Sequence, residues 1–248
     1  MSTCTRRFVK WLLPPALAGV LLMLTGPAGR ADDFIVYSPY VTQGQSEIEF
    51  RGFDELDRNP AINGKNAYEI SVAHAFTGWW NTEFYLGEYQ RLPGQNQQFI
   101  GNEFENVFQL TPEGKYWADA GFLLSYEYHS QNGVPNALEF GPLLEKHAGR
   151  FDHRVNLIWE KEIGPGANGQ YEFRAAYSLS YRIVQTFAPG LEAYIRPGDQ
   201  SYQIGPVFYG ELASHRGNEL EYSAGVVFGI NPDAPSHTLL ARLEYEFY

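Results

Sequence analysis

Cysteine is almost absent from this sequence, since Cys4 is the only one among 248 residues. Basic residues are also few, with 18 Lys and Arg against 29 Asp and Glu. The net charge of −11 argues against a nucleic-acid partner, because affinity for phosphates comes from clustered cations. Long apolar runs are missing as well: Trp11–Leu24 covers 14 residues, fewer than the about 20 that a membrane-spanning helix needs. Aromatic residues, by contrast, make up 16% of the chain, which excludes a disordered protein.

The beginning of the chain has the features of a secretory signal peptide. Cations between Arg6 and Lys10 precede the apolar run, and Gly29-Arg30-Ala31 places small residues at the −3 and −1 positions of a cleavage site. We therefore predict a signal peptide at 1–31 and a single mature domain at 32–248. Its loss removes Cys4, four cations and no acid, so the mature chain has a net charge of −15 and no thiol for disulfides or metal binding.

Alternation of apolar and polar side chains, the signature of a β-strand, recurs through the mature chain, and no amphipathic helix stands out. In Tyr171–Ile183, every second residue from Phe173 onward is apolar or aromatic, whereas Glu172 and Arg174 lie on the other face. His74 is an exception, since it falls on the apolar face of its run. An ionisable side chain is costly within hydrocarbon, so we expect either that His74 lies near a membrane interface or that the faces of this run are assigned the wrong way round.

Turn sequences rich in Gly, Pro and Asn separate these alternating runs and predict twelve strands. The ninth of them is short, so ten strands remain an alternative. The predicted strands span 46–56, 66–76, 80–91, 100–110, 116–128, 137–145, 153–163, 170–184, 191–196, 202–212, 219–230 and 237–247.

Most of these strands are longer than the about 5–6 residues usual in soluble proteins and are near the about 9–11 of a tilted membrane-spanning strand. The mean hydropathy of −0.34 does not argue against a membrane, because it averages an apolar and a polar face. The fold class is therefore predicted to be all-β, a single transmembrane antiparallel up-and-down β-barrel whose apolar face meets lipid. The alternative is a soluble exported β-sandwich that serves as a binding module, with a second sheet covering the apolar face.

The last ten residues, Leu239–Tyr248, form an alternating apolar strand that stops at an aromatic residue. This tail resembles the closing strand of Gram-negative outer-membrane β-barrel proteins, where the terminal aromatic residue belongs to the signal read by the barrel-assembly machinery. The resemblance implies location in the cell outer membrane, outer-membrane lipid and the assembly machinery as partners, and an insertion signal formed by Leu243, Tyr245, Phe247 and Tyr248. Tyr248 departs from the pattern, since the apolar face ends at Phe247. The chain is also weakly similar to small transporters of the MetA-pathway phenol-degradation type.

The polar strand faces would line the barrel lumen, where acids outnumber arginines. This favours a porin-like passive channel or transporter for small polar or cationic solutes, with no cofactor, no metal site and no catalytic residue. A closed structural barrel held by Glu–Arg pairs is the alternative, because twelve strands lie between a filled eight-stranded barrel and an open one of about 16. The residues predicted to line the lumen are Glu69, Glu83, Glu103, Glu105, Asp119, Glu127, Glu172, Arg174, Arg182, Arg242, Glu244 and Glu246.

With an even number of strands, the first strand begins and the last strand ends on the periplasmic side. The connections predicted to be extracellular are all short, so none is expected to fold into the lumen. These connections are 57–65, 92–98, 130–136, 164–169, 197–201 and 231–236.

An outer-membrane lipid hydrolase of the phospholipase or lipid A deacylase type is a further alternative. Those enzymes resemble one another in a His-x-Ser element, and this chain has His129 beside Ser130. Adjacent residues of a strand point to opposite faces, which argues against contact between a base and a nucleophile at this place. His147 and His153 flank a turn with Asp152 but lack the spacing of a zinc-binding motif, so these histidines are interpreted as ordinary turn residues.

Overall fold

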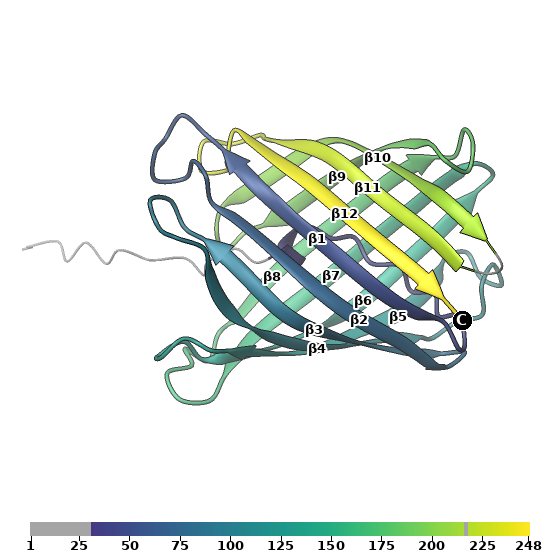
Figure 1. Cartoon of the computed structure of the whole chain (residues 1–248), viewed down its shortest axis with the longest axis horizontal. Helices are drawn as coiled ribbons and strands as arrows, with labels where there is room; N and C mark the ends of the chain where they lie inside the picture. Colours follow the sequence, from purple (N-terminus) through teal and green to yellow (C-terminus); the bar gives the residue numbers. More distant parts are fainter. Residues whose placement is uncertain (1–30, 216–217) are drawn as a thin grey trace, which may run out of the picture.

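The computed structural model describes residues 31–215 and 218–248, so most of the predicted signal peptide lies outside the described residues. Twelve strands form one closed antiparallel barrel in which neighbours in sequence are neighbours in space (Figure 1). Among the described residues, no helix is long and apolar enough to cross a bilayer. The elements are η1 (Ala31–Phe34), β1 (Ser46–Leu56), β2 (Asn66–Thr77), β3 (Trp80–Arg91), β4 (Gln98–Gln109), β5 (Asp119–His129), β6 (Asn136–Ala148), β7 (Phe151–Ile163), β8 (Tyr171–Tyr181), β9 (Ala188–Arg196), β10 (Ser201–His215), β11 (Asn218–Gly229) and β12 (His237–Phe247).

The barrel closes where the last strand meets the first. β12 pairs with β1 over the full length of both strands, from Ser46 opposite Phe247 to Leu56 opposite His237. Closure removes the exposed sheet edges, whose unpaired backbone groups could not be satisfied in hydrocarbon. The prediction of a twelve-stranded barrel is confirmed. The ten-stranded alternative fails because β9 pairs with both β8 and β10, and the sandwich alternative fails because the strands form a single closed sheet.

The two ends of the barrel differ in their connections. We call the end that carries connections 57–65, 92–97, 130–135, 164–170, 197–200 and 230–236 the loop end. We call the opposite end, where β1 begins and β12 ends, the C-terminal end (Figure 1).

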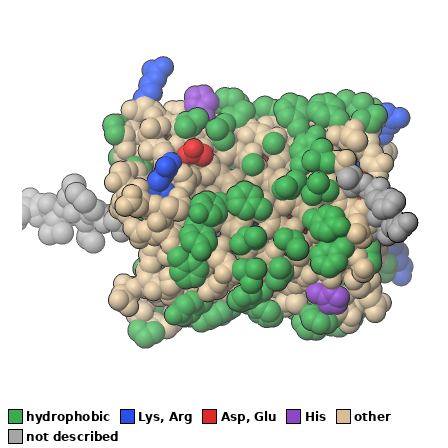
Figure 2. All heavy atoms as spheres, viewed as in Figure 1, with side chains coloured by type: hydrophobic (Ala, Val, Ile, Leu, Met, Phe, Trp, Pro, Cys, Tyr) green, Lys and Arg blue, Asp and Glu red, His purple; other side chains and the backbone are tan. Residues whose placement is uncertain are grey.

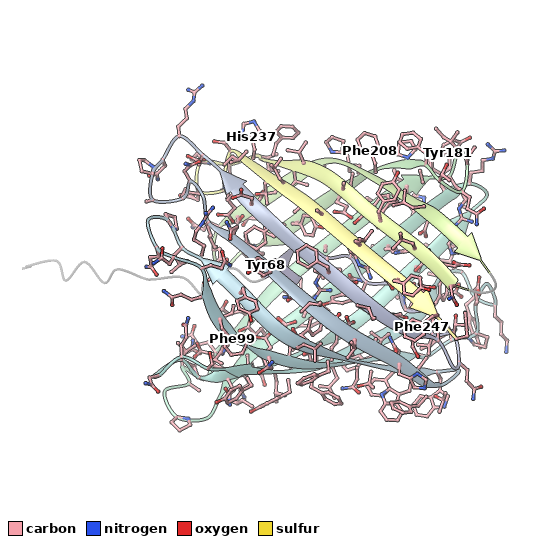
Figure 3. The ribbon with its side chains drawn as sticks, in the orientation of Figure 1. Tyr68, Phe99, Tyr181, Phe208, His237 and Phe247 are labelled. Atoms are coloured by element: carbon pink, nitrogen blue, oxygen red, sulfur yellow. The ribbon has the colours of Figure 1, made fainter. Side chains whose placement is uncertain are left out.

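Large apolar side chains cover the outside of the barrel (Figure 2). Phe50 is 48% exposed and Leu86 is 51% exposed, although both lie well inside their strands. Aromatic side chains point outward toward both rims, among them Phe99 near the loop end and Tyr181 and Phe247 near the C-terminal end (Figure 3). Because carboxylates are buried inside while apolar groups are exposed outside, the barrel inverts the arrangement of a soluble protein and suits a lipid surround.

At the loop end, two connections on either side of the β1–β12 seam are tied together. Asp57 Oδ2 accepts hydrogen bonds from the Ser236 hydroxyl at 2.6 Å and from the Ser236 N–H at 2.7 Å. These bonds, with a further one from the Asn59 N–H, lower the pKa of Asp57 to about 2. The carboxylate therefore stays ionised and holds the two loops together at every pH above that value.

Candidate functional site in the barrel lumen

The chain between η1 and β1 runs inside the barrel (Figure 1). We call residues 33–41 the lumen segment. It begins near the loop end, where Asp33 Oδ2 accepts a hydrogen bond of 2.5 Å from Arg196 Nη1 at the end of β9. Phe34 lies beneath the same guanidinium, 5.0 Å from the ring centroid to Arg196 Cζ. This pair of contacts fixes the start of the segment against β9.

Inward-facing side chains of the barrel bind the polar groups of the lumen segment farther along. Asn156 on β7 holds the Tyr37 backbone from both sides: its Oδ1 accepts from the Tyr37 N–H at 2.6 Å, and its Nδ2 donates to the Tyr37 carbonyl at 3.0 Å. The Ser38 hydroxyl donates to Glu145 Oε2 on β6 at 2.6 Å. Buried backbone groups that lack such partners cost about 1–3 kcal/mol each, so Asn156 makes this path of the chain tolerable inside the barrel.

The last anchors lie toward the C-terminal end. The Tyr40 hydroxyl donates to Asp119 Oδ2 on β5 at 2.7 Å, and the Val41 N–H donates to Gln109 Oε1 on β4 at 2.8 Å. Along the lumen segment the anchoring strand therefore changes in order from β9 through β7, β6 and β5 to β4. The segment follows the inner wall obliquely from the loop end to the C-terminal end.

The lumen segment also buries an apolar surface. Phe34, Ile35, Val36 and Tyr37 are each 7–9% exposed, and burial of such side chains contributes about 1.5–3 kcal/mol each. Ile35 and Tyr37 pack in one cluster with inward-facing residues of β4–β7, and Phe34 and Val36 pack in another with residues of β1, β2 and β8–β12. The barrel residues in these clusters are Val107, Leu123, Leu143 and Ile158 in the first and Phe53, Ala67, Ala176, Tyr194, Val207, Val227 and Leu240 in the second.

One glycine is required by this packing. A Cβ atom added at Gly121 on β5 would lie 2.7 Å from Pro39 Cβ and 3.0 Å from Pro39 Cα. A side chain at position 121 would therefore push the lumen segment off the wall. β5 therefore carries no side chain at the place where Pro39 of the lumen segment contacts it.

A cavity of about 930 Å³ occupies the lumen beside the segment. Its inner end is formed by Phe34, Ile35 and Val36 together with Arg51 and Gly52 of β1. Most of the remaining lining lies at the middle of the barrel or toward the C-terminal end, and no described residue of the six loop-end connections lines the cavity. The cavity is therefore open toward the C-terminal end and closed at the lumen segment.

A row of buried glutamates fills the wall on the side of β2–β6. Glu69 pairs in register with Glu88, and Glu103 pairs with Glu127. Carboxylate oxygens of Glu69, Glu88 and Glu103 lie within 4.8 Å of one another, as do those of Glu103, Glu127 and Glu139. Oxygen ligands at such spacing suit a hard cation. An acidic cluster alone does not assign a metal, and the absence of a cofactor stays a prediction.

The structure gives the residues predicted to line the lumen different surroundings. Seven of them are buried or half-buried among other strand side chains, and three line the cavity. Glu172 and Glu246 are half-buried toward the two ends of the barrel. The seven are Glu69, Glu83, Glu103, Glu105, Asp119, Glu127 and Arg174, and the three that line the cavity are Arg182, Arg242 and Glu244.

Sequence reasoning missed the lumen segment, which it left between the signal peptide and the first strand. The expectation that no loop folds inward concerned the connections between strands, whereas the lumen is occupied from the N-terminal side. A signal was present: apolar residues such as Leu123 and Leu143 interrupt otherwise polar strand faces, and Phe34–Tyr37 is an apolar run with no strand of its own. Each interruption lies where the segment contacts the wall.

Buried polar residues were also missed on several strands. Glu88 escaped because of a register shift in β3 near Gly87, which places both residues on the buried side and breaks the strict alternation. Glu139 and Glu145 of β6 were not predicted because Leu143, which lies between them on the same buried face, is apolar and obscures the polar alternation of that strand. Others missed from the predicted set are Glu192 and Arg196.

His129 and His74 have ordinary hydrogen-bond partners in the structure. Ser130 Oγ donates to the Ile100 carbonyl at 3.1 Å, while the His129 ring contacts the Pro135 carbonyl and Glu127, so the two residues have separate partners. This arrangement does not favour the lipid hydrolase alternative. His74 lies near the C-terminal end, where its Nδ1 is 2.9 Å from Ser46 Oγ.

Of the two predicted turn histidines, His153 has its Nδ1 3.0 Å from the Tyr177 hydroxyl, whereas His147 comes together with Asp152 and Glu145. His147 Nε2 lies 3.2 Å from Glu145 Oε1, and His147 Nδ1 lies 3.5 Å from Asp152 Oδ1. Arg154 binds both carboxylates, at 3.2 Å and 3.1 Å. The Arg154 guanidinium thus neutralises the two carboxylates, and a metal ion at this place would have to compete with it.

The C-terminal residues lie on the outer face of the closing strand. Leu243, Tyr245 and Tyr248 are exposed, Phe247 is half-buried, and the Tyr245 and Phe247 rings stack at 5.8 Å. Tyr248 follows the last strand residue, as its departure from the alternation predicts. Their role as an insertion signal stays a prediction.

Comparisons with known proteins add little beyond the architecture. No family model matches the chain, and no curated protein matches it. Among solved structures, a bacterial polysaccharide outer membrane secretin is similar at 12% identity and a TM-score of 0.40, over 83% of this chain and 99% of that one. CdiB from Escherichia coli is similar at 8% identity and 0.40, over 82% and 63%. An anion-selective porin from Comamonas acidovorans is similar at 7% identity and 0.36, over 82% and 97%.

At these identities and TM-scores the similarities carry no functional assignment. The resemblance to the MetA-pathway type is unsupported by any of these matches. Function has to be inferred from the barrel itself.

Proposed function

We propose that the protein is an outer-membrane, porin-like channel for small polar solutes, and that the lumen segment holds it closed in the described structure. One observation carries this proposal: a large polar cavity leads from the C-terminal end into the barrel and stops at Phe34, Ile35 and Val36. A structural barrel has no need of a cavity of about 930 Å³, whereas a channel closed by a movable segment has one on the accessible side.

The apolar outer surface supports the membrane placement. The connections at the C-terminal end are shorter on average than those at the loop end, which is the usual arrangement at the periplasmic end of a bacterial barrel. On that basis the cavity opens to the periplasm and the lumen segment separates it from the loop end. The segment is attached by side-chain hydrogen bonds and apolar contacts, and no strand of the barrel includes it, so it can leave the lumen without unfolding the sheet.

Conductance through a planar bilayer tests this proposal with an anchor variant. Asn156→Ala removes both hydrogen bonds to the Tyr37 backbone, which weakens the closed state but leaves the strand pairing of β7 intact. A loss of about 1.4 kcal/mol from the closed state raises the ratio of open to closed channels about tenfold. We expect rare openings in the wild-type channel and openings about ten times more frequent in the variant.

The matched control is Asn136→Ala, which removes an asparagine at the loop end whose partners are His129 and Tyr126 rather than the lumen segment. It should leave the opening frequency unchanged. If the refolded, heat-modifiable barrel shows no conductance steps in the wild type or in either variant, the channel is wrong and the structural-barrel alternative stands.

A further inference from the structure

Charges of one sign prevail on each of two walls of the cavity. One wall is formed by β7, the turn before it, β8 and the residue that follows β8, and we call its residues Arg150, Arg154 and Arg182 the arginine wall. The other wall is formed by β10, β11 and β12, and we call its acids the glutamate wall, which are Glu211, Glu219, Glu221 and Glu244. Each wall also carries an opposite charge that is held in an ion pair: Asp152 pairs with Arg154, and Arg242 pairs with Glu244.

Some of these charges are already engaged by neighbours. Arg154 is held by Glu145 and Asp152, Glu244 is held by Arg242 at 2.5 Å, and Glu211 accepts a hydrogen bond of 2.6 Å from Gln185. Arg154 and Glu244 are therefore neutralised by ion pairs of their own. The charges available to a solute are those without an ion pair.

Arg150, Arg182, Glu219 and Glu221 line the cavity and have no ion pair among the described residues. Arg150 and Arg182 lie next to each other, since the Arg182 N–H donates to the Arg150 carbonyl at 2.9 Å. Glu219 and Glu221 both lie on β11, two residues apart and therefore on one face of the strand. The cavity thus offers two unpaired cations on one wall and two unpaired carboxylates on the other.

We propose that this cavity binds small zwitterionic solutes, with their anionic group toward Arg150 and Arg182 and their cationic group toward Glu219 and Glu221. The proposal rests on the channel function and names the class of solute for it. A simple cation is attracted by the glutamate wall but repelled by the arginine wall, and a simple anion meets the reverse. A molecule that carries both charges is attracted by both walls at once.

The remaining lining suits a polar occupant. Residues with hydroxyl groups also line the cavity on both walls: Ser178 and Ser180 on β8, Tyr209 on β10 and Ser223 on β11. The volume of about 930 Å³ lies within the about 300–1,000 Å³ of small-molecule sites. The cavity therefore holds a small solute together with bridging water.

Three probes of one size test the proposal: 4-aminobutanoate carries both charges, butanoate carries the negative one and butylammonium carries the positive one. Binding to the refolded protein in non-ionic micelles is measured by titration calorimetry at low salt, because salt screens exposed charges. We expect 4-aminobutanoate to bind at least about tenfold tighter than either single-charge probe, a factor that corresponds to about 1.4 kcal/mol. Equal affinities for the three probes would overturn the proposal.

Two double variants separate the walls. Arg150→Gln/Arg182→Gln should weaken 4-aminobutanoate about tenfold and bring butylammonium level with it. Glu219→Gln/Glu221→Gln should do the same with butanoate. The control Arg58→Gln/Lys115→Gln changes two cations that do not line the cavity and should leave all three affinities unchanged.

The binding and conductance experiments can contradict the solute proposal and the channel proposal independently. Charge-selective binding to a barrel that never conducts would leave the cavity proposal standing and remove the channel. Conductance together with binding that ignores both double variants would leave the channel standing and remove the assigned class of solute.

Discussion

Deletion of residues 33–41 is expected to convert a barrel that is closed nearly all the time into one that is open nearly all the time. The deletion removes the groups that end the cavity and the hydrogen bonds that anchor the lumen segment from Asp33 to Val41. Each such hydrogen bond contributes about 0.5–1.5 kcal/mol, so together they hold the wild-type channel open for less than about 1% of the time. Mean conductance in a planar bilayer should therefore rise by about 100-fold.

The deleted barrel should still fold, because the twelve strands pair without the lumen segment. Heat-modifiable mobility on a gel checks this before conductance is measured. The apolar residues that contacted the segment would then face water, and a ring of this kind can keep a pore dry. A second variant, which adds Leu123→Ser and Leu143→Ser to the deletion, removes that barrier. If the deletion and the deletion with both serine substitutions fold but neither conducts, the lumen segment does not close a channel.

Leu124→Arg is expected to destabilise the protein by about 2–4 kcal/mol in phospholipid vesicles, because an arginine at the bilayer midplane is costly. Leu124 is the central residue of β5 and is 40% exposed on the outer face. The free energy of unfolding in urea, measured with the protein in vesicles, gives this value directly. On a water-exposed surface the same substitution would have little effect.

The control for this prediction is Leu110→Arg. Leu110 is 63% exposed and follows the end of β4 at the C-terminal end, where an arginine reaches the interface and costs only about 0–1 kcal/mol. A large difference between the two variants supports a lipid-facing surface centred on the middle of the strands. Two small and equal effects would contradict the membrane placement of the barrel.

The strands could be predicted closely from the sequence because their signal is local. Alternation and turn residues fix each strand, and the observed bounds differ from the predicted ones by a few residues at the ends. β1 and β12 match the predicted ranges at both ends, since turn residues bound them and no bulge disturbs them. β3 shows the limit: the register shift near Gly87 reverses the face of Glu88, which period two alone assigns to the outside.

The occupied lumen could not be predicted in the same way because its contacts are distant in sequence. Tyr37 and Asn156 are separated by 119 residues, and Asp33 and Arg196 by 163. Neither pair has a local pattern. The apolar breaks at Leu123 and Leu143 show that something apolar meets the inner wall, but they do not say which segment supplies it.

A cross-link across one anchor tests most directly whether the lumen segment closes the channel. The Ser38 hydroxyl is 2.6 Å from Glu145 Oε2, and the predicted mature chain has no cysteine to interfere with Ser38→Cys/Glu145→Cys. A short thiol-to-thiol cross-linker, with its product verified by mass, then fixes the segment to β6, and Ser38→Cys alone serves as the control. We predict that the untreated double variant opens in bursts in a planar bilayer and that the cross-linked protein stays silent. Unchanged conductance after complete cross-linking would contradict closure by the segment, because the solute path would then bypass it.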